Sequence, residues 1–449
     1  MFLRSTLLSE LLDRCEKVGV FAPASAINQL REELASDRFS FFPLFDHERK
    51  VDLVAGFARQ FLADWKLTRT REIREQEDWA RNPWRRLLWP AHKHVGRSSW
   101  LRRAWYETEN RLLPDPFHAS AFRHLDPDVV VTATAGVTLS DIRMIRRARR
   151  AGVPSVTFTQ GWDNLTSKTI IGARPDYLIV WNERMLQEAV ELHGFSAHQI
   201  TVAGPPHFDP YFRRTGWVDR AAFLRSVGLD PGKRIILYAT SPQRYFTDSI
   251  AIAELLVEAN NAGRFGPDIQ LVIRLHPQVM EGVDADDLGA WERFRGRAYL
   301  DMPRGATGLA ADYTPDGIAH IAQLLAAASV SINVASSISI DAAIFDTPIV
   351  NVRFDAEPGR PYLKSVSRQY DTEHYLQVLR TGAVRLADSA EELIDEVRRY
   401  LADPARERTE RRGLVRALAF KDDGQAGARV AQAIARIGAR PSLRTRATR

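Results

Sequence analysis

The side chains best suited to chemistry follow predicted strands in the second half of the chain. Ser336 and Ser337 begin a predicted helix, where unpaired N–H groups and the helix dipole favour a bound phosphate. Asp341 lies one turn further on the face of Ser337, where its carboxylate could accept hydrogen bonds from ribose hydroxyls. Arg274 and His276 end another predicted strand, and an imidazole there can donate to a phosphate or protonate a leaving group. These five residues predict a site for the ribose and phosphates of a nucleotide.

A loop in the first half of the chain offers a general base. Gly161 permits a tight turn directly after a predicted strand. Asp163 supplies a carboxylate that could remove a proton, and Lys168 supplies a cation that could hold an anion. Trp162 and Asn164 stand beside this carboxylate as candidate loop or acceptor contacts.

Each candidate also has an ordinary structural explanation. Serine is a common helix cap, a histidine before a proline can support a turn, and aspartate with asparagine is a frequent loop pair. The helix dipole alone favours an aspartate in a first turn. Other chemistries find less support, because the sequence has no Walker pattern, no G-x-G-x-x-G after a first strand and no G-x-S-x-G elbow. His92 and His94 lack an evident third ligand, so we expect no metal site and no bound cofactor.

Strands and helices alternate from residue 128 onward. The predicted strands are 129–132, 154–158, 177–181 and 200–203 in the first half, and 235–239, 270–275, 330–333 and 348–352 in the second. This alternation predicts two doubly wound α/β domains, whose ligands bind beyond the carboxyl ends of parallel strands. We expect an N-terminal domain over 1–215, a C-terminal domain over 216–425, and a closing helix with a basic tail over 426–449. The cleft between the domains is the expected site.

The composition is that of a folded globular protein. The 449 residues are 45% hydrophobic and 26% charged, with a formal net charge of +6. This mild excess suits an anionic ligand or a membrane surface and does not indicate nucleic acid. Cys15 is the one cysteine, which excludes an intrachain disulfide and a cysteine-based zinc site. No run of 18 apolar residues predicts a membrane span, and we expect a cytoplasmic protein.

Residues 65–111 form an insertion that differs in texture from the rest. Six of the ten tryptophans lie here with arginines between them, most densely in 84–90 (WRRLLWP). Interfacial helices combine basic residues with tryptophan and leucine, so docking on a membrane is one explanation. Stacking of an acceptor sugar and plain packing of an inserted helical pair are two others, and the sequence leaves all three open.

Five short motifs, in this order, resemble those of the GT-B glycosyltransferases. The resemblance is strongest to the CDP-glycerol glycerophosphotransferases and bacterial surface-polysaccharide transferases, and it covers roughly residues 125–435. The sequence departs from the family in the first loop, where Gln160, or Trp162-Asp163 in a shifted alignment, replaces the family's histidine. The motifs are the loop 161–168, the segment 204–209 (GPPHFD), His276-Pro277, Ser336-Ser337 with Asp341 and then 346–350 (DTPIV), and 423–426 (DGQA).

The resemblance implies a GT-B fold of two Rossmann-like domains facing a cleft, and a nucleotide-sugar-dependent glycosyltransferase. The donor would be a CMP-, CDP- or UDP-linked sugar, and the acceptor a cell-surface polysaccharide or lipid-linked glycan. His276 and the amides of Ser336 and Ser337 would bind the donor phosphate, Asp341 would contact the ribose, and Asp163 would take the acceptor's proton. Such enzymes typically need no metal. A peripheral position at the inner face of the plasma membrane would suit a lipid-linked acceptor.

Three other functions stay open at this point. The first is a polyol-phosphate transferase that builds a teichoic-acid-like polymer. The second is a UDP-sugar 2-epimerase, which shares the fold but needs several cleft carboxylates that the sequence does not identify. The third is a non-catalytic scaffold that docks on a membrane through residues 65–111.

Overall fold

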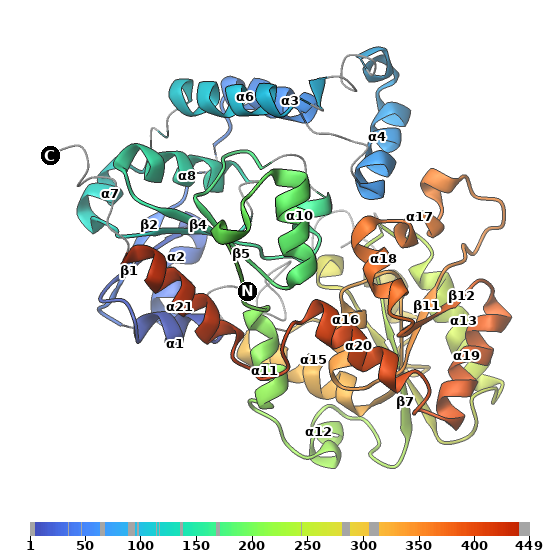
Figure 1. The fold of residues 1–449 in the computed structure, drawn as a ribbon. Coiled ribbons are helices and arrows are strands. Elements are labelled where there is room, and N and C mark those ends of the chain that lie inside the picture. The colour runs from blue at the N-terminus through green and yellow to red at the C-terminus, as the bar shows by residue number, and fades with distance from the viewer. Residues whose placement is uncertain are drawn as a thin grey trace, which may run out of the picture. The chain divides into compact units, whose positions relative to one another are not determined.

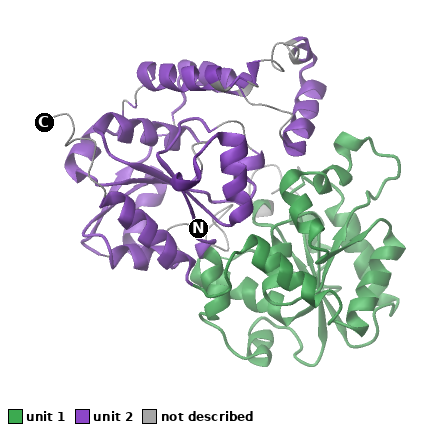
Figure 2. Cartoon of the chain, in the orientation of Figure 1, with its two compact units in different colours: residues 1, 207–424 green, residues 2–206, 425–449 purple. Residues whose placement is uncertain are grey.

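The computed structural model divides the chain into two compact units, coloured separately in Figure 2. The N-unit comprises Phe2–Pro206 and Gln425–Arg449, and the C-unit comprises His207–Gly424 together with residue 1. The division thus falls after Pro206, somewhat earlier than the expected boundary at 215. The residues that the structure describes are 5–34, 36–45, 47–62, 68–88, 95–96, 98–113, 115, 117–134, 138–167, 171–243, 245–280, 288–304 and 314–439.

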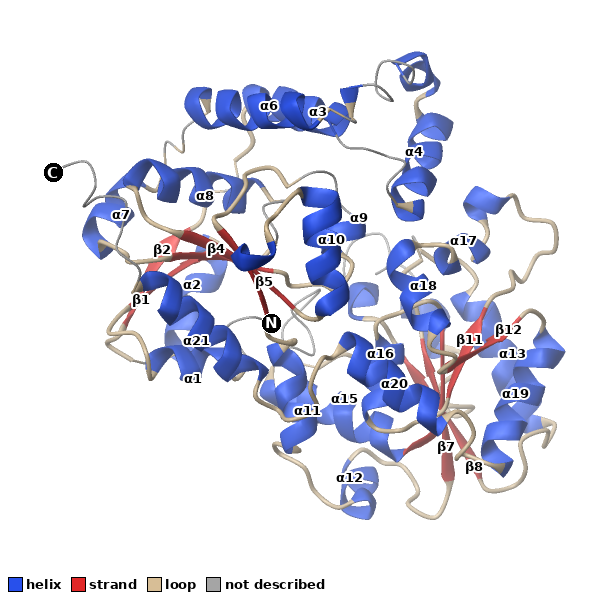
Figure 3. Cartoon of the chain, in the orientation of Figure 1, coloured by secondary structure: helices blue, strands red, loops and turns tan. Residues whose placement is uncertain are grey.

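The C-unit is built on a six-stranded parallel sheet in the order β12-β11-β10-β7-β8-β9 (Figure 3). Its central strands are mostly apolar and almost fully buried, as expected for a sheet covered on both faces by helices. The strands are β7 (Arg234–Ala239), β8 (Ile269–Arg274), β9 (Tyr299–Asp301), β10 (Ala328–Asn333), β11 (Ile349–Val352) and β12 (Val384–Ala387). The helices are α11 (Asp209–Arg213), α12 (Arg220–Ser226), α13 (Ser249–Asn261), α14 (Leu288–Glu292), α15 (Pro315–Ala327), α16 (Ile338–Ile344), α17 (Ser367–Tyr370), α18 (Glu373–Arg380), α19 (Ala390–Ala402) and α20 (Arg408–Leu418).

The N-unit has a four-stranded parallel sheet, β3-β4-β5-β6, and a separate parallel pair, β1-β2. The strands are β1 (Val18–Ala22), β2 (Phe39–Pro43), β3 (Val130–Thr132), β4 (Ser155–Phe158), β5 (Tyr177–Val180) and β6 (Ile200–Val202). The helices are α1 (Leu7–Leu12), α2 (Ala24–Glu33), α3 (Lys50–Leu62), α4 (Arg69–Arg81), the 3-10 helix η3 (Pro83–Leu88), α6 (Ser99–Leu112), α7 (Ala119–Leu125), α8 (Leu139–Ala151), α9 (Asn164–Ser167), α10 (Glu183–His193) and α21 (Ala426–Gly438).

The C-terminal helix α21 packs against α1 within the N-unit. A glycine makes this approach possible, because a Cβ on Gly427 would lie 2.2 Å from the hydroxyl of Thr6 and 2.9 Å from the backbone nitrogen of Leu7. The chain therefore returns to the unit in which it began, through the helix predicted at 426.

The chain passes between the units twice, after Pro206 and after Gly424. In each unit, an arginine side chain bonds to a backbone carbonyl near these points. In the C-unit, Nε of Arg213 donates to the carbonyl of Gly424 at 2.7 Å, where Gly424 has a φ of +63°. In the N-unit, Nε of Arg429 donates to the carbonyl of Ala203 at 2.7 Å. Gly424 lies in the segment 423–426 singled out in the sequence, and Ala203 directly precedes the segment 204–209. These contacts favour a structural role for Gly424 and for the chain next to the segment 204–209.

Buried ion pairs attach α3 and α6 to α8 within the N-unit. Nη2 of Arg143 on α8 donates to Asp52 on α3 at 2.8 Å, with both side chains nearly inaccessible. Burial opposes ionisation of Asp52, but hydrogen bonds from Arg49 and Arg143 outweigh it and hold its pKa well below the usual range. On α6, Glu109 pairs with Arg146 of α8 and with Arg59 of α3.

Asp52→Asn is expected to destabilise the protein by about 3–5 kcal/mol at neutral pH, because it leaves the buried Arg143 without a counter-charge. Chemical denaturation at pH 7 measures this. The double variant Asp52→Leu/Arg143→Met should cost clearly less than the single variant, since it removes both charges. Equal losses for the single and double variants would contradict a coupled pair.

Candidate functional site

The carboxyl ends of the C-unit strands bring the predicted phosphate-binding residues to one edge of the sheet. β7 pairs with both β8 and β10, so the strand order reverses there, which is where open α/β sheets bind ligands. Thr240 follows β7, His276 follows β8, and Ser336 with Ser337 follow β10. β8 and β10 are separated by two strand spacings, about 10 Å. Thr240 was missed in the sequence, although its position directly after the apolar run of β7 was the available signal.

His276 is held in a defined tautomer. Its backbone N–H donates to the hydroxyl of Thr240 at 2.9 Å, which ties the ends of β8 and β7 together. Its Nδ1 accepts a hydrogen bond from the backbone N–H of Gln278 at 3.1 Å. In the neutral ring the proton is therefore on Nε2, which can donate to an anionic oxygen.

Ser336 and Ser337 lie in the turn that leads into α16. Ser337 is exposed and Ser336 half-buried, and Ala335 before them has a φ of 26°. Ser336 accepts backbone hydrogen bonds from Ile338 at its hydroxyl (3.5 Å) and from Ser339 at its carbonyl (3.1 Å).

A fully buried polar network supports this turn from below. The hydroxyl of Ser339 donates to Asn333 at 3.0 Å and lies 2.9 Å from the hydroxyl of Tyr375. The side-chain amide of Asn351 donates to Asn333 at 2.9 Å, and Tyr375 donates to Asn351. The network joins the ends of β10 and β11 to α16 and α18, so it fixes the backbone on which the two serines sit.

Arg274 has a different position from the one expected. It is buried, and Nη1 pairs with the carboxylate of Asp301, its register partner on β9. Asp301 also bonds to Nε2 of His320 at 2.7 Å. Burial of Asp301 favours its neutral form, but the charge of Arg274 and the bond to His320 lower its pKa. The predicted donor contact of Arg274 is thus replaced by an internal ion pair, because the last residue of β8 faces the core.

Asp341 also departs from its predicted role. It accepts a hydrogen bond from Tyr211 of α11 instead of facing outward with Ser337. Burial raises the pKa of this carboxyl to about 7, and the hydrogen bond from Tyr211 offsets only part of that effect. A ribose contact was expected from helical spacing alone, whereas the observed contact directs Asp341 toward α11.

The raised pKa of Asp341 predicts a pH-dependent stability. The folded state retains the proton between about pH 4 and 7, where the unfolded state loses it, so wild-type stability falls across that window. Asp341→Asn cannot lose a proton, so its melting temperature should rise relative to wild type from pH 4 to 8. Tyr211→Phe removes the bond that favours ionisation of Asp341 in the folded state, so the decline in stability should extend to higher pH than in wild type. A melting difference between Asp341→Asn and wild type that stays constant across this range would contradict the buried carboxyl.

An ion pair that the sequence did not reveal joins two loops at the carboxyl edge of the C-unit sheet. Arg360, in the loop after β11, bonds to both oxygens of Asp248 at 3.0 Å, just before α13. Side-chain hydrogen bonding with Asp248 outweighs burial and raises the pKa of Arg360. Asp248 also accepts from the backbone N–H of Ala356 at 2.8 Å. The loops after β7 and β11 are therefore joined, and no local sequence pattern indicated this long-range pair.

The predicted base lies in a tight turn at the carboxyl end of β4. The N–H of Gly161 donates to the side-chain oxygen of Asn164 at 2.6 Å. Asp163 is half-buried, and its carboxylate accepts a hydrogen bond from the hydroxyl of Ser167 at 2.5 Å. A Cβ on Gly161 would come within 2.8 Å of a carboxylate oxygen of Asp163, so a larger residue here would displace that carboxylate from its observed position. Trp162 is buried beside it, and Lys168 lies outside the described residues.

Neighbouring helices hold this turn in place. The hydroxyl of Thr68, which caps α4, donates to the carbonyl of Thr166 at 3.2 Å, and Arg74 of α4 donates to the carbonyl of Ser167. His193 of α10 bonds to the carbonyl of Leu165 at 2.8 Å. Burial and the charge of Arg71 lower the pKa of His193 to about 3, so its ring is neutral and donates from Nε2. The α4 part of the insertion thus packs onto the loop that carries Asp163.

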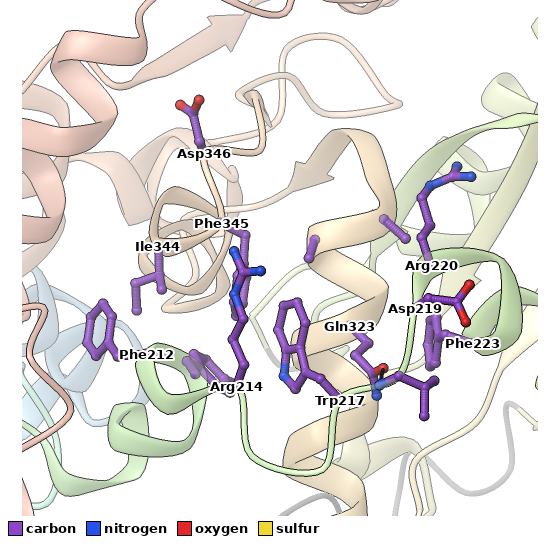
Figure 4. Close-up of a pocket in the computed structure, with 14 residues that line it drawn as sticks. Phe212, Arg214, Trp217, Asp219, Arg220, Phe223, Gln323, Ile344, Phe345 and Asp346 are labelled. Carbon is purple, nitrogen blue, oxygen red and sulfur yellow. Dashed lines mark hydrogen bonds between the residues drawn. The ribbon is translucent and has the colours of Figure 1, made fainter.

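A cavity of about 600 Å³ lies at the opposite edge of the C-unit sheet (Figure 4). Its lining includes Ala327 and Phe345, which precede β10 and β11 in the chain. The rings of Trp217 and Phe345 lie 5.5 Å apart, and the guanidinium of Arg214 covers Trp217 at 5.1 Å. Asp346 on its wall is paired with Arg408 and Arg411 of α20 at 2.6 and 2.8 Å. The charge of Asp346 is thus neutralised within the fold.

The described residues contain no group of three histidine, cysteine or acidic side chains placed to hold a metal ion. None of their helices has the length and apolar character needed to cross a bilayer.

Known proteins with similar structures share the two-domain architecture. The glycosyltransferase of kitacinnamycin aligns over 96% of this chain and 94% of its own, with 15% identity and a TM-score of 0.51. UDP-GlcNAc 2-epimerase from Neisseria meningitidis aligns over 93% and 99%, with 11% identity and a TM-score of 0.50. At these identities the likeness shows the fold alone. The chain thus has the expected GT-B fold, with two Rossmann-like domains.

Sequence comparison identifies the family. A search of curated protein sequences finds no match. The family described as CDP-Glycerol:Poly(glycerophosphate) glycerophosphotransferase, in contrast, matches residues 79–436. Because this match covers most of the 449 residues, the chain belongs to the CDP-glycerol:poly(glycerophosphate) glycerophosphotransferase family.

Proposed function

We propose that the protein transfers a sugar from a CMP-, CDP- or UDP-linked donor to a cell-surface polysaccharide or lipid-linked glycan. The observation that carries this proposal is the fixed tautomer of His276 at the edge where the C-unit strand order reverses. A neutral imidazole with its proton on Nε2 donates a hydrogen bond without needing a low pH. Thr240, Ser336 and Ser337 follow neighbouring strands at the same edge, which suits a nucleotide phosphate.

In this reaction the acceptor hydroxyl attacks the anomeric carbon of the donor. The bond from that carbon to the nucleotide phosphate oxygen breaks, and its electron pair leaves with the phosphate. The acceptor's proton passes to the carboxylate of Asp163, whose orientation Ser167 holds by a hydrogen bond. His276 and the backbone N–H groups near Ser337 stabilise the negative charge that grows on the leaving phosphate.

Transfer of a glycerophosphate or another polyol phosphate is the second candidate, because the matching family is described by a CDP-glycerol donor. Here the acceptor hydroxyl attacks the phosphorus next to the glycerol, and CMP leaves with the electron pair of the broken P–O bond. The same C-unit groups would hold the nucleotide. Gln160 and Asp163, in place of the family's loop histidine, favour the sugar over this alternative.

A thermal-shift panel of CMP, CDP, UDP, GDP and NAD tests the nucleotide site. A ligand at 100 times its dissociation constant stabilises the folded state by about 2.7 kcal/mol. We expect one or more pyrimidine nucleotides to raise the melting temperature, and Ser337→Tyr, which blocks an exposed position, to abolish the shift. Equal shifts in wild type and Ser337→Tyr, or no shift with any pyrimidine nucleotide, would contradict the proposal. Nucleotide release from CDP-glycerol and from sugar nucleotides then separates the two candidates.

A peripheral position at the inner face of the plasma membrane completes this proposal, since a lipid-linked acceptor would be there. The insertion 65–111 was the expected contact. Its helix α4 packs on the loop of Asp163, which favours the structural explanation for that part. The exposed Trp84 and Leu87 of η3 and Trp100 of α6 are apolar residues of the insertion that favour a surface role.

A further inference from the structure

Helix α3 directs Asp52 and Arg59 toward the body of the N-unit, while several of its apolar residues face solvent. Asp52 is held by Arg143, and Arg59 pairs with the buried Glu109. Leu53 and Val54, in contrast, are 55% and 66% exposed. A surface helix of a soluble protein normally has the opposite arrangement, with its polar face outward. The ion pairs fix this orientation, so the exposed apolar face is a built feature of the fold.

An apolar groove of about 490 Å³ runs between α3 and α6, which lie side by side above α8 in Figure 1. Two lining residues carry polar atoms, Thr108 and Trp105. The indole nitrogen of Trp105 is buried and makes no hydrogen bond within the described part of the chain. A molecule with a hydrocarbon chain would fill the apolar groove, and an oxygen acceptor on the same molecule would bond to the indole N–H of Trp105. The groove is lined by Phe57, Ala58, Phe61, Leu62, Val95, Leu101, Ala104, Trp105 and Thr108.

The charges beside the groove favour an anionic partner. Lys50, Arg103 and Arg111 are exposed, and helical spacing places them next to the exposed apolar positions of the two helices. Every acidic side chain of α3 and α6 is engaged by arginine: Asp52 by Arg49 and Arg143, Glu107 by Arg149, and Glu109 by Arg59 and Arg146. A second copy of this cationic surface would repel it, whereas anionic headgroups would attract it.

We propose that the α3–α6 surface, Lys50–Leu62 with Ser99–Leu112, docks the protein on an anionic phospholipid bilayer with an acyl chain in the groove. The exposed Trp100 would lie at headgroup level, as interfacial tryptophans do. An ester oxygen of the lipid would accept the hydrogen bond of Trp105. The inference rests on the proposed function for its membrane-linked acceptor, and it extends the expected contact to α3, which lies outside residues 65–111.

Flotation of the full chain with phospholipid vesicles tests the surface. Wild type is expected to bind vesicles that contain phosphatidylglycerol more tightly than vesicles of phosphatidylcholine alone. Leu53→Glu/Val54→Glu should weaken binding to both kinds of vesicle by at least roughly tenfold, because two apolar side chains that would insert into the bilayer are replaced by charged ones. Lys50→Glu/Arg103→Glu should weaken binding to the anionic vesicles by at least roughly fivefold per charge and change binding to neutral vesicles little.

Two matched variants test whether vesicle binding depends on the α3–α6 surface in particular. Val190→Glu replaces an exposed apolar residue of α10 in the same unit and should bind as wild type does. Leu87→Glu probes η3, the alternative within the insertion, and should retain most of the binding. The inference fails if wild type does not float, if Leu53→Glu/Val54→Glu floats as wild type does, or if Leu87→Glu alone abolishes binding. It also fails if the wild type is a dimer that Leu53→Glu/Val54→Glu dissociates, because a second copy then covers the face.

The nucleotide-induced thermal shift, measured on the same variants, keeps the two proposals distinguishable. All of the substituted positions are exposed and lie in the N-unit, so a melting temperature without ligand that matches wild type shows that each variant is folded. A nucleotide shift of wild-type size shows in addition that the site in the C-unit is intact. If the variants bind vesicles as expected but wild type shows no nucleotide shift, the proposed nucleotide site is contradicted and the proposed docking surface is still supported.

Discussion

Asp163→Asn is expected to lower kcat by about 10²–10⁴-fold, because the acceptor hydroxyl loses the carboxylate that takes its proton. The dissociation constant of the nucleotide should stay unchanged, since Asp163 is in the N-unit and the proposed nucleotide site in the C-unit. The amide fits the same turn, so the melting temperature should change little. Steady-state release of nucleotide with acceptor present measures the rate, and the thermal shift measures binding.

Ser167→Ala is the matched control for this prediction. It removes the hydroxyl that donates to the carboxylate of Asp163 at 2.5 Å, and with it a bond that favours the ionised form. The acid limb of the kcat/KM profile should therefore move to higher pH, with a much smaller loss at the optimum. Wild-type activity of Asp163→Asn would exclude this residue as the base. An unshifted acid limb in Ser167→Ala would show that the group titrating in the kcat/KM profile is not Asp163.

His276→Ala is expected to lower kcat/KM by about 10²–10³-fold, because the leaving phosphate loses a preorganised donor. In contrast to Asp163→Asn, this variant should also bind the nucleotide more weakly. Gln278 donates from its backbone to Nδ1, so the wild-type ring does not need to be protonated to act. The wild-type rate should therefore not depend on protonation of His276 as the pH is lowered.

Thr240→Val gives the corresponding positioning control. It keeps the shape of the side chain and removes the hydroxyl that accepts the backbone N–H of His276 at 2.9 Å. A loss smaller than that of His276→Ala, with KM rising more than kcat falls, is expected. If His276→Ala retained full nucleotide affinity and rate, the carboxyl edge of the C-unit sheet would not be the donor site.

Much of the fold could be predicted from the sequence because its central strands are short, mostly apolar runs. The runs that became β7 and β10 are buried on both faces, which is the pattern that a parallel sheet requires. The edge strands β9 and β12 were missed. They have three and four residues, and β12 carries the exposed Arg385 at its second position, so neither forms a recognisable run.

The site was predictable to the extent that it depends on strand ends. The sequence placed His276 and Ser336 at the ends of predicted strands, and the structure has both at the carboxyl edge of the C-unit sheet, where parallel strands end together. Their role in binding phosphate stays a prediction. Arg274 and Asp341 were misplaced because their partners are distant in sequence. Arg274 pairs with a residue of the missed strand β9, and Asp341 bonds to a tyrosine of α11 that precedes the whole C-unit sheet. Helical spacing gives the face of a residue but does not say which neighbour covers it.

The insertion shows a similar limit. Its tryptophans and arginines suggested a single surface over residues 65–111, but the structure divides it. α4 supports the loop of Asp163, while α6 pairs with α3, whose sequence carries no tryptophan. The orientation of α3 depends on ion pairs with α8 and α6, and these were not readable from the spacing of its own residues.

A crystal structure of the protein soaked with CDP would show directly where the nucleotide binds. We expect electron density for the diphosphate at the carboxyl edge of the C-unit sheet, with an oxygen in hydrogen-bond contact with Nε2 of His276 and close to Ser336 and Ser337. Ordered CDP at any other place, such as the cavity beside Trp217 at the opposite edge, with the His276 edge empty, would contradict it.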